Sequence, residues 1–242
     1  MGNAVVVSEL AKVIGERIIV DRISFTVQEG EVFGLLGANG SGKTTTFNML
    51  SGLLSPSSGA VTILGKSLKE MQRSPVIGFV TQEDSFYEML TVRENLEFFA
   101  SQYGVGGDIA RVRIKKLLEQ ARLDEKSGVL ASKLSGGMKK RLNIACSLVH
   151  DPKVIFLDEP TVGLDPIIRR EIWAMIDDLH SMNKTIIITS HYMEEVERLC
   201  SRVAIMFAGS IVDSGTPEGL KRKYKLKQME DVFAYLMKPV VR

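Results

Sequence analysis

The chain has 242 residues, 45% hydrophobic and 25% charged, a composition typical of a globular protein long enough to bury a large core. Its formal net charge of +2 gives no bulk electrostatic reason to expect nucleic acid binding. Cys146 and Cys200 are too few for a disulfide framework and lack metal-ligand spacing, which predicts buried free thiols. No segment approaches the roughly 20 apolar residues of a membrane span, so we expect a soluble or membrane-peripheral protein.

The N-terminal part of the chain has the pattern of short strands separated by turn residues. Between the predicted strands at 31–37 and 60–65, residues 43–54 carry apolar side chains at helical spacing. This order predicts a strand, a glycine-containing loop and a helix. The four predicted strands cover residues 4–10, 22–27, 31–37 and 60–65.

The middle of the chain, from about residue 91 to 150, is rich in helical patterns, and TVRE at Thr91–Glu94 is a capping box. Two nearly continuous apolar segments follow, at 153–159 and 185–191, of the kind that is buried on both faces of a parallel sheet. A helical pattern at 167–182 links them, and two further strands and a helical tail end the chain. The order predicts an α/β core interrupted by a helical insertion.

The segment GANGSGKT matches the phosphate-loop pattern GxxxxGK[ST] in full and follows an apolar strand where a helix begins. Backbone N–H groups of such a loop bind phosphate oxygens, its lysine reaches the β and γ phosphates, and its hydroxyl offers a ligand to Mg²⁺. A glycine-rich turn of chance composition is the alternative, which the strand and helix context disfavours. The predicted phosphate site consists of Gly37, Ala38, Asn39, Gly40, Ser41, Gly42, Lys43, Thr44 and Thr45.

Two acids and a histidine end the later apolar strands. At the carboxyl edge of an open α/β sheet, Asp158 is placed to hold Mg²⁺, and Glu159 to polarise an attacking water as general base. A solvated turn is the alternative for these acids, and the phosphate loop argues against it. We expect His191 at the same edge, within reach of a γ phosphate, although a single histidine is more often structural. His150 and His180 are interpreted as structural.

The segments GANGSGKTT, LSGGM, VIFLDEP, VGLD and ITSH occur in the order and approximate spacing of the ATP-binding cassette (ABC) ATPases. The chain resembles this family over essentially its whole length, and GGM with an ending like MEDVF resembles its drug-exporter-type branch. The resemblance implies one domain over 1–242, binding ATP and Mg²⁺. Residues of about 1–90 and 151–242 are expected to form the P-loop NTPase core, a mixed sheet with flanking helices. The same ranges are expected to include an antiparallel β subdomain and the C-terminal tail. A helical signature subdomain is expected over about 91–150.

Family roles carry over to matching positions. The resemblance implies that Lys43, Glu159, His191 and Gln82 are catalytic, with Gln82 also joining Thr44 and Asp158 at Mg²⁺. Without the resemblance, Gln82 is equally a surface glutamine after a strand.

Asp165, in VGLDP, is implied to cross a dimer interface. The alternative for Asp165 is an Asp-Pro turn.

The segment KLSGGMKKRL looks like a second helix start suited to an anion. In the ABC family this segment faces ATP held by another cassette, which implies that Ser135, Gly136 and Gly137 contact a γ phosphate bound at a partner's Lys43. A helix N-terminus offers N–H groups and a partial positive charge there. A structural N-cap would explain Ser135 but not two glycines, each of which weakens a helix by about 1 kcal/mol. The basic residues 139–141 either add positive potential near phosphates or face solvent.

Two positions depart from the commonest family pattern. Met138 stands where Gln is commoner, but Met is familiar in exporter-type members, so activity is expected to persist. Ile14 falls where many members have an aromatic residue that stacks on adenine. Without that stacking we predict weak nucleobase selection, with GTP accepted nearly as well as ATP.

A transport ATPase needs a surface that couples it to its membrane partner. We predict that Phe86, Tyr87 and Met89, in a loop, form a groove for a short partner helix. Phe98 and Phe99, by contrast, are expected in the core of the helical part.

The sequence predicts the Mg²⁺-dependent ATPase subunit of an ABC exporter, cytoplasmic and peripheral on the inner face of the cell membrane. Two identical or paralogous cassettes are expected to pair head to tail around two ATP molecules and to act on a separate integral membrane permease. The basic run KRKYKLK, residues 221–227, is interpreted as a solvated helix face rather than a lipid contact. The alternatives are a soluble ABC ATPase of the assembly or repair type and a non-hydrolysing nucleotide-binding regulator.

Overall fold

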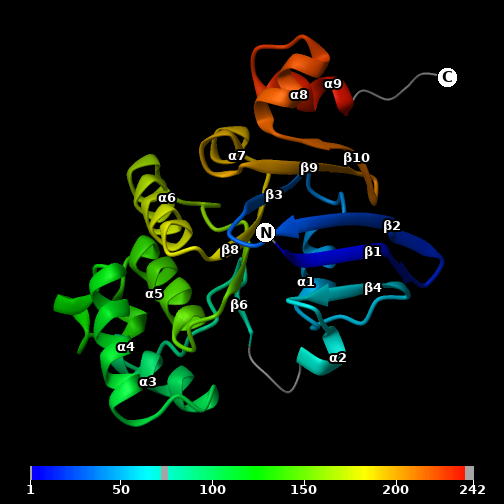
Figure 1. The fold of residues 1–242 in the computed structure, drawn as a ribbon. Helices are drawn as coiled ribbons and strands as arrows, with labels where there is room; N and C mark the ends of the chain where they lie inside the picture. Colours follow the sequence, from blue (N-terminus) through cyan, green and yellow to red (C-terminus); the bar gives the residue numbers. More distant parts are fainter. Residues whose placement is uncertain (1, 72–75, 238–242) are drawn as a thin grey trace.

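The computed structural model describes residues 2–71 and 76–237 of the chain. Of the predicted domain over 1–242, residues 1, 72–75 and 238–242 therefore lie outside the described residues. Two sheets form the framework (Figure 1). An antiparallel sheet has the order β2-β1-β4-β5, and a larger mixed sheet has the order β10-β9-β3-β8-β7-β6. The antiparallel strands are β1 (Asn3–Ile14), β2 (Arg17–Gln28), β4 (Ser58–Ile63) and β5 (Lys66–Ser67). Those of the mixed sheet are β3 (Val32–Gly37), β6 (Ile77–Val80), β7 (Val154–Asp158), β8 (Thr185–Ser190), β9 (Arg202–Phe207) and β10 (Ser210–Gly215).

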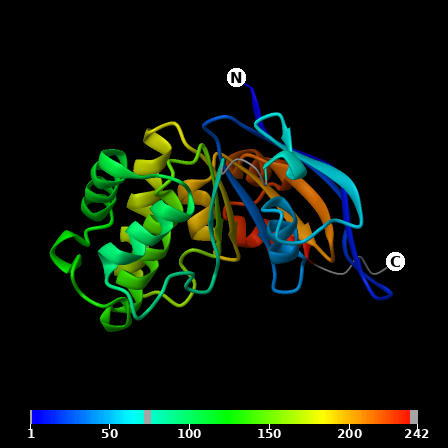
Figure 2. The same ribbon diagram turned by 90° about the horizontal axis from the view of Figure 1, so that it is seen from below.

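Helices pack around the mixed sheet. Figures 1 and 2 show α3, α4 and α5 gathered at one side of the molecule and the antiparallel sheet at the other. Helices α8 and α9 lie beyond β9 and β10 (Figure 1). The α-helices are α1 (Lys43–Leu50), α2 (Leu68–Met71), α3 (Val92–Gln102), α4 (Gly107–Gln120), α5 (Gly136–Leu148), α6 (Pro166–Ser181), α7 (Met193–Leu199), α8 (Pro217–Tyr224) and α9 (Met229–Leu236). Together with the sheets they form an α/β fold that matches the predicted class.

The centre of the mixed sheet is parallel, and its strand ends define one edge. Strands β3, β7 and β8 are buried along their whole length, as their apolar sequences predict. Leu36 pairs with Ser190, and Asp158 pairs with Thr189, so the carboxyl ends of the three strands lie side by side. The register therefore brings the chain after β3, β7 and β8 to the same edge.

The β1–β2 hairpin is longer than its sequence pattern predicts. Its pairing shifts register at several points, and Glu9 and Arg22 have positive φ angles of 47° and 44°. Such irregularities interrupt the alternation of apolar and polar side chains, which is the signal that marks a strand in a sequence. For this reason the prediction covered only residues 4–10 of β1 and 22–27 of β2 and missed the parts of both strands next to the hairpin turn.

The helical part begins with the predicted capping box. The Thr91 hydroxyl accepts a hydrogen bond from the Glu94 backbone N–H at 3.2 Å, and the Glu94 carboxylate accepts one from the Thr91 N–H at 2.7 Å. These two hydrogen bonds lower the pKa of Glu94. The capping box thus fixes the start of α3, as predicted.

Both cysteines are free and buried, which confirms the prediction for them, and burial raises the pKa of each thiol. Within residues 2–71 and 76–237, no helix is long and apolar enough to cross a lipid bilayer.

Candidate active site

The loop between β3 and α1 leaves the start of a helix open to an anion. Gly42 is the N-cap of α1, and no side chain caps the helix, so the N–H groups of its first turn remain available. Gly42 has a φ angle of 103°, and a Cβ there would lie 2.8 Å from the Ile19 carbonyl oxygen. Only glycine fits this position, which explains one fixed residue of the phosphate-loop pattern.

The loop is supported from behind by two other segments. The Ser41 carbonyl accepts a hydrogen bond from the Gly209 N–H at 3.1 Å, and the Gly209 carbonyl accepts one from the Asp21 N–H at 2.8 Å. In front of the loop lies a cavity of about 440 Å³. Its lining residues are Ile19, Asn39, Gly40, Gly42, Lys43, Thr44, Thr45, Gln82 and Glu159.

Lys43 lies beneath this cavity with only 4% of its surface exposed. Its Nζ donates hydrogen bonds to the carbonyls of Gly37 at 2.7 Å and Ala38 at 3.2 Å, and lies 3.6 Å from Glu159 Oε1. Burial lowers the pKa of Lys43, and the negative charges of Glu159 and Asp158 oppose that shift. The loop therefore holds a buried cation beside the place where a phosphate would lie.

Thr189, at the end of β8, holds both acids of the site. Its hydroxyl donates to Asp158 Oδ1 and accepts a hydrogen bond from the Glu159 N–H at 2.9 Å. The Glu159 N–H also lies 3.2 Å from the Thr189 carbonyl oxygen. Glu159 has a φ angle of +46°, a conformation that costs free energy in a residue other than glycine. The contacts with Thr189 hold Glu159 in this conformation, with its carboxylate at the cavity.

Burial is the main influence on the pKa of Asp158. It raises the pKa of Asp158, whereas the hydrogen bond from Thr189 and the charge of Lys43 act in the opposite direction.

His191 follows β8 and faces the same acid. Its Nδ1 lies 3.3 Å from Glu159 Oε1, and its ring lies against Tyr192 with centroids 4.3 Å apart. The structure therefore brings Lys43, Glu159 and His191 together at one edge of the sheet, where sequence analysis placed them. Thr189 was missed, because a threonine inside an apolar strand gives no signal of its own.

Oxygen donors suited to Mg²⁺ lie at the same edge. The Thr44 hydroxyl lies beside the Asp158 carboxylate, and Gln82 lines the cavity. In the described part of the chain no group of three or more His, Cys, Asp or Glu side chains forms a metal cage. Mg²⁺ at nucleotide sites needs only one or two carboxylates together with phosphate oxygens, so the donor set fits this ion.

Comparisons with known proteins agree with this geometry. The ABC transporter family profile matches residues 20–162. A Nod factor export ATP-binding protein I of Burkholderia lata is 44% identical over 211 residues, which cover 86% of this chain and 69% of that protein. The chain belongs to the ABC transporter family. A probable multidrug ABC transporter ATP-binding protein of Escherichia coli K12 is 42% identical over 215 residues. That match covers 88% of this chain, which thus spans little more than a third of the Escherichia coli protein, 37% of its length.

Solved structures share the fold of this ABC cassette. An ATP-binding subunit of an ABC transporter superimposes with a TM-score of 0.86 at 26% identity, over 97% of this chain and 100% of that one. A dimeric ATP-binding cassette bound to ADP and phosphate in a post-hydrolysis state has a TM-score of 0.77 at 27% identity. This second match covers 88% of the present chain and 98% of the other.

The signature segment, LSGGM at residues 134–138, leads into α5. The Ser135 hydroxyl caps the helix by accepting a hydrogen bond from the Met138 N–H at 3.4 Å, so Ser135 has a structural role within its own chain. Ser135 and Gly136 are exposed. A Cβ at Gly136 would meet no described atom within 4 Å, whereas one at Gly137 would lie 2.5 Å from Ile168 Cγ2. The two glycines thus differ: Gly137 lets α5 pack on α6, and Gly136 leaves an open surface.

This difference predicts the effect of alanine at each glycine. Gly137→Ala is expected to lower the free energy of unfolding by about 1–3 kcal/mol, because its Cβ overlaps Ile168 in a packed helix contact. Gly136→Ala is expected to leave stability unchanged or raise it by up to about 1 kcal/mol, because alanine favours helix. Urea unfolding of the two variants measures both effects.

The double variant Gly137→Ala/Ile168→Ala is the control, since removing the overlapping methyl groups is expected to return part of the lost stability. If Gly137→Ala is as stable as the unsubstituted chain, the close packing of α5 on α6 is wrong.

The three basic residues 139–141 differ in their surroundings. Lys139 pairs with Glu88, and Lys140 is buried, with its Nζ hydrogen-bonded to backbone carbonyls. Arg141 is also buried, 3.9 Å from Glu171 Oε2 on α6. Burial of Lys140 and Arg141 corrects the solvent-facing alternative for these two, since side chains five and six residues beyond the N-cap point back into the protein on a helix that is packed on both sides. Lys139 is half-buried, and an effect of these residues on the potential near phosphates stays a prediction.

Two further predicted positions have clear local structure. Asp165 is the N-cap of α6 and accepts hydrogen bonds from the N–H groups of Ile167 and Ile168, each at 3.0 Å. Ile14 is 55% exposed at the end of β1, while Ile19 lines the cavity. The interface role of Asp165 and the effect of Ile14 on base selection stay predictions.

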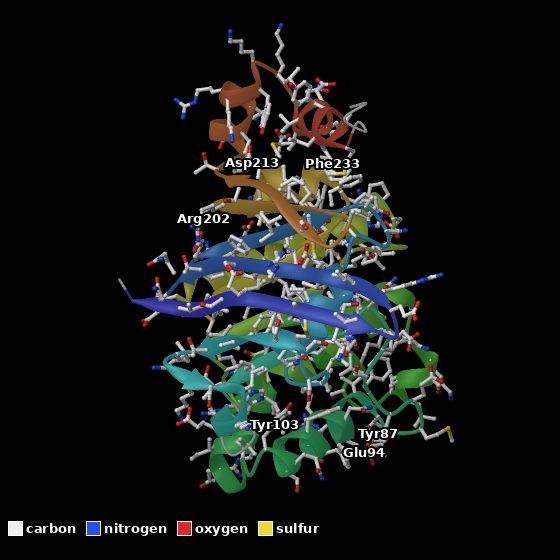
Figure 3. The ribbon with its side chains drawn as sticks, turned by 90° about the vertical axis from the view of Figure 1, so that its right-hand side faces the viewer. Tyr87, Glu94, Tyr103, Arg202, Asp213 and Phe233 are labelled. Atoms are coloured by element: carbon white, nitrogen blue, oxygen red, sulfur yellow. The ribbon has the colours of Figure 1, made fainter. Side chains whose placement is uncertain are left out.

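The predicted coupling surface is only partly exposed. Phe86 belongs to the core with 8% exposure, so its assignment to a surface groove was wrong. Tyr87 and Met89 are 51% and 81% exposed. Tyr87 lies edge-on to Phe98 with ring centroids 4.6 Å apart. Phe98 and Phe99 are both half-buried, and of the two Phe99 packs against the hydrophobic core. Figure 3 shows Tyr87 beside Glu94 at the helical end of the molecule, far from Asp213 and Phe233.

The remaining histidines and the basic tail have structural surroundings. His150 Nε2 lies 2.8 Å from the Ile77 carbonyl oxygen, and His180 Nε2 lies 3.0 Å from that of Gly30. In the basic run, Lys221 pairs with Glu197, and Lys223 pairs with Asp213. These lysines face solvent while paired with acids, as the interpretation of a solvated helix face predicts.

Proposed function

We propose that this ABC cassette is the ATP-hydrolysing subunit of an exporter and that it works as a head-to-tail pair on a separate membrane permease. The observation that carries the proposal is the convergence of a buried lysine, a general base and a histidine beside an uncapped helix start. Lys43 Nζ and His191 Nδ1 lie 3.6 Å and 3.3 Å from the same oxygen of Glu159. An ATP-binding site needs Lys43 and the helix start, and hydrolysis needs Glu159 and His191.

Different residues of the site bind the phosphates, hold the metal ion and act on the attacking water. The N–H groups at the start of α1 and the Lys43 ammonium bind the β and γ phosphates, with Lys43 exchanging its carbonyl partners for phosphate oxygens. Thr44, Asp158 and Gln82 would hold Mg²⁺, which would neutralise charge on the phosphate oxygens. Glu159 accepts the proton of the attacking water, and His191 positions the Glu159 carboxylate and the γ phosphate.

The signature segment completes the site of a second copy. Ser135 and Gly136 are exposed at the start of α5, outside the cavity that Lys43 lines in the same chain. A helix N-terminus directed outward is suited to the γ phosphate of another molecule's ATP. The similarity to a dimeric cassette bound to ADP and phosphate supports this arrangement. Asp165 is placed at the same interface, either of a homodimer or of a pair with a paralogous cassette.

The exposed aromatic surface formed by Tyr87, Met89 and Phe98 is proposed to receive the permease. An exposed methionine two residues after Tyr87, whose ring lies edge-on to that of Phe98, suits a short apolar helix of a partner. Because this surface is on the segment that also carries Gln82, permease contact and nucleotide state are linked through one stretch of chain. Export is supported by the name of the Nod factor relative, and the subunit is proposed to lie on the cytoplasmic face of the membrane.

A phosphate-release assay tests the proposed activity. Purified protein is expected to release phosphate from ATP only with Mg²⁺ present, and EDTA is expected to abolish release because Asp158 and Thr44 then lack the ion that neutralises the phosphates. With Ile14 in place of a stacking aromatic residue, GTP is expected to be hydrolysed within about threefold of the ATP rate, since stacking on a base contributes about 1–3 kcal/mol when present.

Full activity in EDTA contradicts the metal assignment, and no release under any condition favours a nucleotide-binding regulator. A strong ATP preference contradicts the expected effect of Ile14. Co-purification with a polytopic membrane protein from detergent-solubilised membranes distinguishes the transporter subunit from a soluble ABC ATPase.

A further inference from the structure

The loop that carries Gln82 is fastened by its backbone to α5. Lys140 Nζ donates hydrogen bonds to the carbonyl oxygens of Thr81 at 3.2 Å and Gln82 at 3.3 Å. Lys140 is 6% exposed, and a buried ammonium is costly unless polar groups bind it. Its binding to carbonyls leaves the Gln82 side chain free to line the nucleotide cavity.

A second side chain of α5 extends this attachment. Asn143 lies three residues after Lys140, on the same face of the helix, and is 2% exposed. Its Nδ2 donates to the Glu83 carbonyl oxygen at 3.2 Å, and its Oδ1 accepts from the Ser85 N–H at 3.3 Å. The loop after β6 therefore follows the position of α5 over several consecutive residues.

We propose that Lys140 is a positioning residue that holds Gln82 at the nucleotide cavity and ties it to the helix that begins with the signature segment. The inference rests on the proposed function, in which Gln82 is one of the residues that hold Mg²⁺. Since Gly136 begins the same helix, a displacement of α5 at the partner's γ phosphate moves the Gln82 of its own chain. Lys140 thus links two nucleotide sites through one buried side chain.

Hydrogen–deuterium exchange tests the attachment independently of catalysis. Lys140→Met keeps the length and burial of the side chain but removes its donors, and the amides of residues 81–85 are expected to exchange at least about tenfold faster. Lys139→Met is the matched control, because the neighbouring Lys139 pairs with the exposed Glu88 and is expected to leave exchange at 81–85 unchanged.

Steady-state kinetics test the positioning role. Lys140→Met is expected to lower kcat about tenfold, with KM for ATP changed less than about twofold, because the phosphate loop is untouched. In a Gln82→Ala background the same substitution is expected to cause no further loss, since Lys140 acts through Gln82. Lys140→Gln, which keeps one donor group, is expected to recover part of kcat.

Additive losses in the double variant, or unchanged exchange and kcat in Lys140→Met, overturn the inference. If the unsubstituted chain releases no phosphate, the proposed function fails instead, and exchange at residues 81–85 alone then decides whether Lys140 holds the loop.

Discussion

Glu159→Gln is expected to lower the rate of phosphate release at least about a hundredfold while leaving ATP binding intact. The glutamine amide occupies the volume of the carboxylate but accepts no proton from water. The backbone of residue 159 is held by Thr189 and not by its own side chain, so the substitution is expected to preserve the fold. Phosphate release at saturating ATP, together with ATP affinity, measures the change.

The same variant is expected to accumulate as an ATP-bound dimer. If hydrolysis normally separates the two copies, a chain that binds ATP without hydrolysing it remains closed. Size-exclusion chromatography with ATP and Mg²⁺ detects the dimer. Glu194→Gln is the matched control, because this nearby acid is exposed and its loss is expected to change neither rate nor elution. A Glu159→Gln protein that elutes as a monomer with bound ATP contradicts the mechanism.

Sequence patterns predicted the sheet edge best, for a physical reason. Strands β7 and β8 are buried on both faces, so their residues must be mostly apolar until the strand ends, and the first charged or ionisable residues then mark the edge. Asp158 and His191 stand at those ends, which made their meeting predictable. The phosphate loop was equally predictable, because the φ angle of Gly42 and its approach to Ile19 leave glycine no substitute.

Other features depend on contacts between distant segments, which a sequence does not show. Phe86 lies in a loop but belongs to the core, and the preceding residue, Ser85, is hydrogen-bonded to Asn143 of α5. Its burial therefore has no local signal in the sequence. Lys140 looks like part of a solvated basic run, and only the loop after β6 supplies the carbonyls that bury it. Thr189 is one hydroxyl in an apolar strand, and its role is visible only when β7 lies beside it. The close approach of Gly137 to Ile168 likewise has no local signal, and its predicted contact with a partner's γ phosphate stays a prediction.

In the proposed dimer the signature segment of one copy contacts the ATP held by the other. Two substitutions separate the halves of such a site. Lys43→Met removes the buried cation and is expected to lower the chain's own ATP hydrolysis at least about a hundredfold. Gly136→Asp is expected to lower it as much for a different reason, because a carboxylate at this open position repels the partner's γ phosphate. The fold is expected to tolerate the second substitution, since an acid in the first turn favours a helix.

Mixing the two inactive proteins tests whether the site is shared between copies. A mixed pair contains one intact site, formed by Lys43 of the Gly136→Asp chain and Gly136 of the Lys43→Met chain. With random pairing in a one-to-one mixture, about a quarter of the unsubstituted activity is expected to return. Each protein mixed with itself at the same total concentration provides the baseline. Phosphate release that equals this baseline in the mixture would show that no site is shared between copies, contrary to the arrangement proposed here.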